Sequence, residues 1–483
     1  MAGYIGSKAV NLSTTGADIQ GDISVDGDYS SDTLGTSNLR LGVNAGNSIT
    51  SGGNYNVVVG DEAGTAITTG DYNVALGYVA LDANTTASEN IAIGGYALGT
   101  NILGSKSTAV GSGALQTQNY ATATDGLNVA VGYASGSGVT TGVQNTLIGS
   151  SSGDALTNAD FNVAVGYQAL TTDTLGSKSV AIGMNTLSAQ NFTTATDSFN
   201  TAVGHSAGFA VTTGGQNTLI GGRAGDALTD ADHNVAVGQQ ALSSDTLGSR
   251  SVAIGQGALF AQNFTTATST YNVAVGYEAG VANLTGEQNT LIGGLAGQSL
   301  TDADVNVAIG ISSLGADIKG SKSVAIGAET LRNQNFTTST DSHNTAVGFT
   351  TGNGITTGIH NTLVGSLAGD ALTDADFNTA LGANALSADT LGSRATAIGY
   401  NTLSAQNFTT ATNSYNVAVG HNAGVAVTTG TKNTFVGSIS GPSLTTVDFC
   451  TFVGYGSGNA VTTGASNTAV GYSALGNSSP TTG

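Results

Sequence analysis

A short pattern of apolar and small residues recurs along almost the whole chain. Each copy begins with asparagine, alternates apolar and small side chains over three residues, and ends at glycine, as in NVAVG from Asn162 to Gly166. Alternation with a period of two is typical of a short β-strand with one apolar face. The same phase returns from residue 38 to residue 467, with serine, alanine or cysteine in place of asparagine in some copies. The pattern therefore predicts 25 successive strands, one in each coil of a repetitive fold.

The spacing between copies follows a rule, in which three equal steps are followed by a longer one. Successive copies begin at Asn145, Asn162, Ser179, Asn200 and Asn217, and this arrangement repeats every 72 residues. Repeats of constant length are the signature of a solenoid, in which each coil contacts only its neighbours. The sequence therefore predicts an all-β parallel β-solenoid, or β-roll, in place of the three or so globular domains that 483 residues would otherwise suggest.

The segment 162–178 illustrates what the sequence predicts for the rest of a coil. Gly166 ends the first strand, and glycine is the residue that best tolerates a positive φ or a close backbone approach. A second extended piece brings the chain back and offers Ala169 and Leu170 to the interior. Only two prolines occur in the chain, which suits a continuous ladder of hydrogen bonds. Strands stacked about 4.8 Å apart would make 25 coils about 120 Å long.

The asparagine at the start of most coils and the glycine four positions later are the candidates for structural ladders. Stacked asparagine amides can hydrogen-bond to one another and to the backbone of turns. We expect this role of Asn145, Asn217, Asn289, Asn361 and Asn433, which lie 72 residues apart. We expect the turn role of the glycines four positions later, which are Gly149, Gly221, Gly293, Gly365 and Gly437.

The long coils, which precede the longer step, differ from the others in their start and in an insertion. They begin with serine or alanine, and their extra residues fall within segments such as QNFTTATD. We expect these segments to protrude from one edge as a row of loops about 19 Å apart. Each places an aromatic ring at the same position, where it would either pack onto a neighbouring chain or serve a function of the loop. The rings are those of Tyr120, Phe192, Phe264, Phe336 and Phe408.

Charged residues keep the same period. Basic residues directly precede the long coils, and an acidic residue lies nearly one ordinary coil length before four of them. Because residues one coil length apart stack on each other, each acid should lie next to a base on the neighbouring coil. We therefore expect exposed ion pairs, each contributing about 0 to 1 kcal/mol. The expected pairs are Asp160 with Lys178, Asp232 with Arg250, Asp304 with Lys322, and Asp376 with Arg394.

Composition narrows the possible partners. The net charge of −20 argues against binding to nucleic acid, which needs clustered lysine and arginine. No run of about 18 apolar residues occurs, so we expect no membrane insertion. The single cysteine, Cys450, excludes an intrachain disulfide and is expected to be a buried structural thiol. The apolar content suffices for only a narrow core, so we expect partner chains to complete the burial of a thin solenoid.

The sequence contains no recognisable catalytic or cofactor-binding constellation, and we expect a protein without enzymatic activity, cofactor or metal. The five histidines are not at metal-ligand or triad spacing, and no phosphate-binding loop occurs. Three alternatives stay open. Paired carboxylates in LTDAD segments, such as Asp230 with Asp232, could bind a cation, or carboxylates from different chains could form a glycan hydrolase site. A column of threonines, including Thr140, Thr157 and Thr174, could form an ice-binding face.

The copies SVAIGMNTL, SVAIGQGAL, SVAIGAETL and NVAVGYQAL resemble the head repeats of trimeric autotransporter adhesins, the YadA-like family. The resemblance extends from Asn38 to Gly483. It implies a left-handed parallel β-roll, a homotrimer of chains packed side by side, and adhesion to a surface. Carried over to this chain, it implies that Val180 and Ile182 face the core with Gly183 at the turn. Residues Val252, Ile254 and Gly255 would repeat that arrangement.

Two departures from the family shape the functional hypothesis. The coils are longer than the family's repeat, and no signal peptide, coiled-coil stalk or membrane anchor is recognisable. An adhesin without these parts looks like a virion component released by lysis, and the opening residues are similar to the starts of bacteriophage tail-fibre proteins. We therefore expect an attachment segment at 1–37, which would dock onto other virion proteins, and a β-solenoid shaft at 38–483.

The functional expectation is a phage tail fibre or fibre-like adhesin of the virion that contacts a glycan or protein on the host surface. The alternative is a structural extracellular filament or surface layer without a specific receptor, and a third reading is a monomeric binding solenoid. Head-to-tail polymerisation in solution would favour the filament. A single chain that stays soluble without partners would favour the monomeric solenoid.

Overall fold

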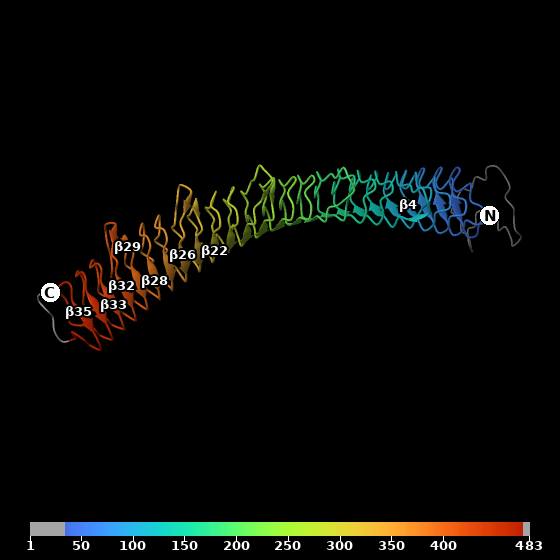
Figure 1. Cartoon of the computed structure of the whole chain (residues 1–483). Coiled ribbons are helices and arrows are strands. Elements are labelled where there is room, and N and C mark those ends of the chain that lie inside the picture. The colour runs from blue at the N-terminus through green and yellow to red at the C-terminus, as the bar shows by residue number, and fades with distance from the viewer. Residues whose placement is uncertain (1–33, 477–483) are drawn as a thin grey trace, which may run out of the picture.

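The computed structural model describes residues 34–476, which form one elongated, gently bent rod of stacked coils (Figure 1). The described residues contain β-strands and turns and no helix. Successive coils pair through parallel strands, so the predicted all-β parallel solenoid of about 25 coils is confirmed. Of the segment predicted for attachment, 1–37, all but residues 34–37 lies outside the described part of the chain.

One three-residue strand per coil contributes to a continuous main sheet along the rod. These strands are β1 (Leu39–Leu41), β2 (Val57–Val59), β3 (Val74–Leu76), β4 (Ile91–Ile93), β6 (Thr108–Val110), β8 (Val129–Val131), β9 (Thr146–Ile148), β10 (Val163–Val165), β12 (Val180–Ile182), β14 (Thr201–Val203), β15 (Thr218–Ile220), β16 (Val235–Val237), β18 (Val252–Ile254), β20 (Val273–Val275), β21 (Thr290–Ile292), β22 (Val307–Ile309), β24 (Val324–Ile326), β26 (Thr345–Val347), β27 (Thr362–Val364), β28 (Thr379–Leu381), β30 (Thr396–Ile398), β32 (Val417–Val419), β33 (Thr434–Val436), β34 (Thr451–Val453) and β35 (Thr468–Val470).

Ten shorter strands accompany the long coils in parallel pairs. They are β5 (Gly104–Ser105) with β7 (Thr124–Asp125), β11 (Gly176–Ser177) with β13 (Thr196–Asp197), β17 (Gly248–Ser249) with β19 (Thr268–Ser269), β23 (Gly320–Ser321) with β25 (Thr340–Asp341), and β29 (Gly392–Ser393) with β31 (Thr412–Asn413). The second member of each pair lies in the long coil. The inserted residues therefore form local structure on the side of the rod away from the main sheet, where β29 is seen in Figure 1.

The strands of the main sheet are in register, residue for residue. In β10 and β12, Val163 pairs with Val180 and Ala164 with Ala181. Equivalent positions of successive coils therefore form columns that run along the rod. A pattern that recurs once per coil in the sequence becomes a continuous stripe on the surface or in the core.

The orientation expected for the strand residues was wrong. The middle residue of each strand points inward, so that Ala181 is fully buried, whereas Ile182 is 38% exposed and Val180 is half-buried. The strand at Val252 and Ile254 has the same orientation. The reason is the narrowness of the coil: the returning segment fills the space opposite the strand with its own apolar residues. Ala169 and Leu170 do so as predicted, and both are fully buried.

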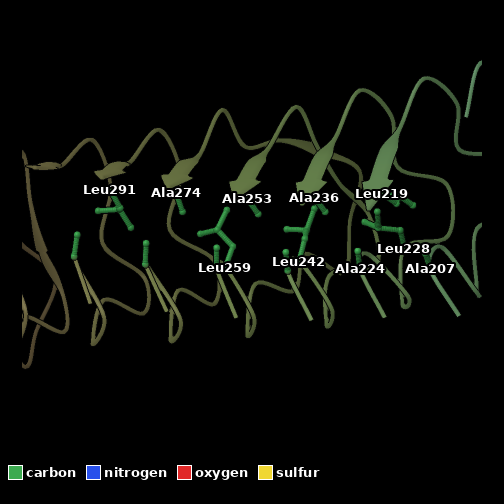
Figure 2. Packing of buried hydrophobic residues seen from close by; sticks show 14 of the residues in the cluster. Ala207, Leu219, Ala224, Leu228, Ala236, Leu242, Ala253, Leu259, Ala274 and Leu291 are labelled. Carbon is green, nitrogen blue, oxygen red and sulfur yellow. The ribbon is translucent and has the colours of Figure 1, made fainter. Parts of the chain in front are cut away.

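The core alternates large and small residues between the sheet and the returning segment (Figure 2). The strand of one coil supplies Leu219, and its returning segment has Gly225 at a position where a Cβ would lie 2.8 Å from the Leu219 side chain. In the next coil the strand supplies Ala236 and the returning segment supplies Leu242. Such complementary volumes keep the packing dense, as in protein interiors generally. The four-coil period of the sequence is thus also a period of core packing.

The asparagine ladder is confirmed. The backbone N–H of Asn217 donates to Oδ1 of Asn200 at 2.9 Å, and Oδ1 of Asn217 accepts the backbone N–H of Asn234 at 2.9 Å. Its Nδ2 donates to the carbonyl of Ala231 within the same coil at 2.8 Å. The bonds donated by the backbone N–H and by Nδ2 recur at the other predicted ladder residues, and all five asparagines are fully buried. The other four are Asn145, Asn289, Asn361 and Asn433.

The predicted turn glycines adopt the left-handed backbone region. Gly149, Gly221, Gly293, Gly365 and Gly437 have φ between 128° and 136°. A Cβ at Gly221 would lie 2.5 Å from the carbonyl oxygen of Gly238 in the next coil, so close stacking as well as φ requires glycine there.

The long coils maintain the ladder by a different device. Ser179 replaces the initial asparagine, and the buried Gln190 of the same coil accepts from Asn200 Nδ2 at 2.9 Å and donates to Ser179 Oγ at 2.9 Å. Gln190 also donates to Oδ2 of the fully buried Asp173 at 2.5 Å, whose Oδ1 accepts the N–H of Gly176 at 3.0 Å. Buried polar groups in such a network are satisfied, which is the condition for tolerating them in a core.

Candidate interaction surface

The outward-facing residues of the main sheet form one largely apolar surface, which we call the outer face. It consists of the first and third residues of the 25 strands. The third residue is valine, isoleucine or leucine in every strand, and the first is β-branched in every strand except β1, where it is Leu39. Strands of three residues stacked about 4.8 Å apart make a face of about 10 Å by 120 Å. Soluble monomers rarely expose a contiguous apolar patch larger than a few hundred Å².

Aromatic residues border the outer face on both sides. One border is the residue before each initial asparagine, where half-exposed rings include Tyr72, Phe199 and Tyr271. The other border is the residue after each turn glycine, where they include Tyr167 and Phe349. Most of the large hydrophobic residues that are exposed in the described chain belong to the outer face or to these two borders. The apolar surface is therefore concentrated on one side of the rod.

The first border also carries stacked rings and cations. His360 stacks between His343 and Phe377, with centroid distances of 5.0 Å and 4.9 Å. The guanidinium of Arg394 lies over Phe377 at 5.1 Å and over Tyr415 at 5.9 Å. Stacking along the rod covers the ring faces and leaves the ring edges toward solvent. This arrangement stabilises the border itself, since cation–π contacts at exposed sites contribute about 0.5–1 kcal/mol each.

The predicted ion pairs are wrong in their partners. Lys178 pairs with Asp197, which lies ahead of it in the long coil, at 2.5 Å. Asp160 does lie beside Lys178, because the backbone N–H of Lys178 donates to its carbonyl, but its carboxylate accepts the N–H of Val143 on the preceding coil. The same choice is made by Asp232, Asp304 and Asp376, whose carboxylates accept the N–H groups of Gly215, Glu287 and Ile359.

The remaining basic residues of this column follow the same scheme. Lys106 pairs with Asp125 at 2.7 Å and Lys322 with Asp341, and hydrogen bonding to Lys322 lowers the pKa of Asp341. Arg250 and Arg394 face no carboxylate at that position and donate to the side chains of Ser269 and Asn413. In these turns a backbone N–H of the preceding coil donates to the carboxylate. Because the carboxylate is already bonded, the longer basic side chain extends to the inserted segment.

The aromatic rings of the inserted segments do not protrude, contrary to expectation. Phe192, Phe264, Phe336 and Phe408, together with Tyr120, are only 5–6% exposed. The ring of Phe192 packs over Gly176, where a Cβ would lie 2.7 Å from the ring. Tyr120 donates to the carbonyl of Gly142 at 2.8 Å, and burial raises its pKa to about 12. The rings anchor the inserts within their own chain, whereas the threonines that follow, such as Thr193 and Thr194, are exposed.

The carboxylates and threonines considered for cation binding and ice binding form hydrogen bonds between neighbouring coils. In the LTDAD turns, Asp230 accepts from Thr213 at 2.6 Å and Asp232 accepts the N–H of Gly215 at 2.7 Å. Thr157 donates its hydroxyl to the carbonyl of Thr174 at 3.0 Å, so this threonine column bonds coil to coil. Within residues 34–476 no group of three or more histidine, cysteine or acidic side chains could hold a metal ion. Over the same range, no helix could cross a membrane.

Three features escaped the sequence reasoning. The first is the outward orientation of the strand valines and isoleucines. It depends on which face of the sheet the returning segment covers, and an alternating pattern does not indicate which set of residues points inward. The buried Asp173 and Gln190 were legible as polar residues recurring at the same position of each four-coil unit, since Asp245 and Gln262 repeat them. The third is a shallow pocket of about 260 Å³ next to Phe260. Its only indication in the sequence is that Phe260 departs from the repeat.

No protein-family model matches the chain, and a search of curated proteins finds no significant match. What can be said of function therefore comes from the fold and from this surface.

Proposed function

We propose that the chain is the shaft of a fibrous virion protein, a phage tail fibre or a fibre-like adhesin, which projects from the particle and attaches it to the host surface. The repetitive rod supports this proposal, because a stack of similar coils can span the distance from a particle to a surface. The observation that carries it is the largely apolar outer face, which runs along the described rod and which a projecting shaft would bury by association of its copies.

Association of copies would take place through the outer face and its aromatic borders. A face of about 10 Å by 120 Å exceeds the roughly 800 Å² per partner of a standard protein interface. Three copies, as the resemblance to the trimeric adhesins implies, would enclose the three outer faces around a common axis. The acidic and threonine-rich sides of the coils would then face solvent, which suits a rod with a net charge of −20.

The exposed parts of the inserts are candidates for contact with the host surface. They recur every four coils, about 19 Å apart, and each is held on a buried aromatic anchor. Weak contacts repeated along a rod add up through effective concentration, so no single insert has to bind tightly.

Quantitative mass spectrometry of density-banded virus particles tests the proposal. A virion fibre predicts recovery of this chain at a fixed, low ratio to the major capsid protein, in multiples of three copies. Absence from particles together with abundance in cell-surface or filament fractions would refute it and favour a structural extracellular filament.

The oligomeric state can be measured on the isolated full-length chain. Sedimentation equilibrium is expected to give three times the chain mass of 47.3 kDa. Replacing outward Val237 and Ile220 by aspartate should reduce this to the mass of one chain while the β-sheet circular dichroism signal is retained. A wild-type chain that is monomeric at micromolar concentration would contradict association through the outer face.

A further inference from the structure

One place on the rod breaks the pattern of the coils around it. The residue two positions after the turn glycine is Gln240 in one coil, Gly257 in the next and Glu278 in the third. All three have left-handed φ values, of 57°, 65° and 49°, so the backbone conformation is the same with and without a side chain. Because glycine is not needed for the conformation at this position, its presence at 257 leaves a gap in a column of side chains.

A shallow pocket of about 260 Å³ occupies this gap. Its lining is formed by Gln240, Gln256, Gly257, Phe260, Glu278 and Val281. Phe260 is 36% exposed, and its backbone N–H donates to the carbonyl of Gly257, which places the side chain beside the gap. The four positions equivalent to Phe260 in the other long coils are polar: Gln116, Ser188, Arg332 and Ser404. An exposed ring at this position therefore has no counterpart in the other long coils.

The lining combines one aromatic ring, one aliphatic side chain, two amides and one carboxylate. Amides donate and accept hydrogen bonds, and a carboxylate accepts them, so the polar groups suit neighbouring hydroxyls on one ligand. An aromatic ring offers an apolar surface to the C–H groups of a sugar ring. The volume lies just below the roughly 300–1,000 Å³ of pockets for drug-sized ligands, which suits a single ring. Glu278 disfavours an anionic ligand, because a second negative charge would be repelled.

We propose that this pocket binds a single neutral sugar residue of a host-surface glycan. The inference rests on the proposed attachment function for its biological setting, but the binding itself is a property of the isolated chain. Specificity comes from the hydroxyl pattern read by Gln240, Gln256 and Glu278, with the sugar ring packed against Phe260. A sugar ring has about a dozen non-hydrogen atoms, and at the ligand efficiency usual for drug-sized ligands we expect an affinity in the millimolar range. If copies associate as proposed, the pocket would recur on every copy.

Saturation-transfer NMR on the full chain tests the proposal with methyl glycosides of glucose, galactose, mannose and N-acetylglucosamine, and with a methyl glucuronide as the anionic probe. We expect transfer to at least one neutral glycoside and at least tenfold weaker transfer to the glucuronide. Gly257→Gln fills the gap with the side chain of the preceding coil, and Phe260→Ser introduces the residue of Ser188. Each should weaken binding of the neutral glycoside at least tenfold.

The chain offers a matched control. Gly113 has the same position two four-coil units earlier, with φ of 70°, and Gln116 stands there in place of Phe260. Gly113→Gln should leave glycoside binding unchanged, and thermal melting should show that both glycine variants fold. Failure of all neutral glycosides to bind, equal binding by Gly257→Gln, or preference for the glucuronide would each overturn the proposal. Sugar binding by a chain that is absent from particles would sink the virion function and leave this inference standing.

Discussion

The two faces of the main sheet differ in a way opposite to most soluble β-proteins. The inward face carries mainly alanine, with leucine in every fourth coil over much of the rod, whereas the outward face carries valine, isoleucine and threonine. The valines and isoleucines of the main sheet thus lie mostly on the exposed side. The comparison teaches that the single chain buries one apolar face of its sheet by folding and leaves the other exposed, and we propose that association of copies buries this second face.

The largest expected difference between the two faces is in the free energy of unfolding after a charged residue is introduced. Ala236→Asp would bury an unpaired carboxylate in the core, and we expect a loss of at least about 3 kcal/mol in unfolding free energy. Val237→Asp, its neighbour on the outer face, should change the stability of the isolated chain by less than about 1 kcal/mol. Urea denaturation of both variants measures the difference, and equal losses would contradict the assignment of the two faces.

Truncation of a core leucine should have the next largest effect. Leu219→Ala removes the side chain that fills the space left by Gly225, and we expect a loss of about 2–5 kcal/mol. On the outer face, Ile220→Ala is the matched control and should cost less, because its side chain is 39% exposed in one chain. Chemical denaturation at a concentration where the chain is monomeric gives both values. A larger loss for Ile220→Ala would indicate that the outer face is already buried in solution.

The asparagine ladder is also fully buried, but it contributes hydrogen bonds in place of apolar packing and should be less sensitive to substitution. Asn217→Ala leaves the N–H of Asn234 and the carbonyl of Ala231 without their partner, at about 1–3 kcal/mol for buried groups of this kind. Ala395 naturally occupies the equivalent position of one long coil, so Ala395→Ser should be close to neutral. Thermal melting of the two variants checks this, and no destabilisation by Asn217→Ala would show that water replaces the ladder bonds.

The smallest effect concerns a half-buried carboxyl on the returning segment. Burial raises the pKa of Asp82, and its Oδ1 has no hydrogen-bond partner. A raised pKa in the folded state means that the stability this group contributes is present at low pH and is lost as pH rises through the folded pKa. Asp82→Asn should therefore be slightly more stable than the wild type at pH 7 and equal to it at pH 3. Melting curves across this range would contradict the account if the difference were larger at pH 3.

The fold was predicted well from the sequence because its strongest signal is periodic. A fixed step between the starts of ordinary coils determines their register, and the ladder roles of Asn217 and Gly221 followed from it. Side-chain partners were predicted poorly, as for Asp160 and Lys178, because the competing acceptor for a backbone N–H is invisible in the sequence. The positive φ of residues such as Leu170, at 55°, was also missed, since a non-glycine residue rarely adopts that conformation.

The inserts show the same limit. The position of Phe192 in a longer coil indicated a protruding loop, but the missing side chain at Gly176 gave its ring a place inside. Recognising this requires knowing which residue of the preceding coil lies beneath the insert. The length and the period of the coils can be measured in the sequence. The packing of a ring against a glycine depends on which residues of neighbouring coils lie next to each other in the structure.

The junction between successive four-coil units has a consequence for how such a chain can change. Each unit begins with the same asparagine, which bonds to the preceding coil, and with the same turn glycine four residues later. Removal of the 72 residues from 217 to 288 would therefore join two coils whose contacts already match. Each such deletion or duplication in the gene would shorten or lengthen the rod by about 19 Å and leave its cross-section unaltered. The molecule is therefore a ruler whose length can evolve in whole steps.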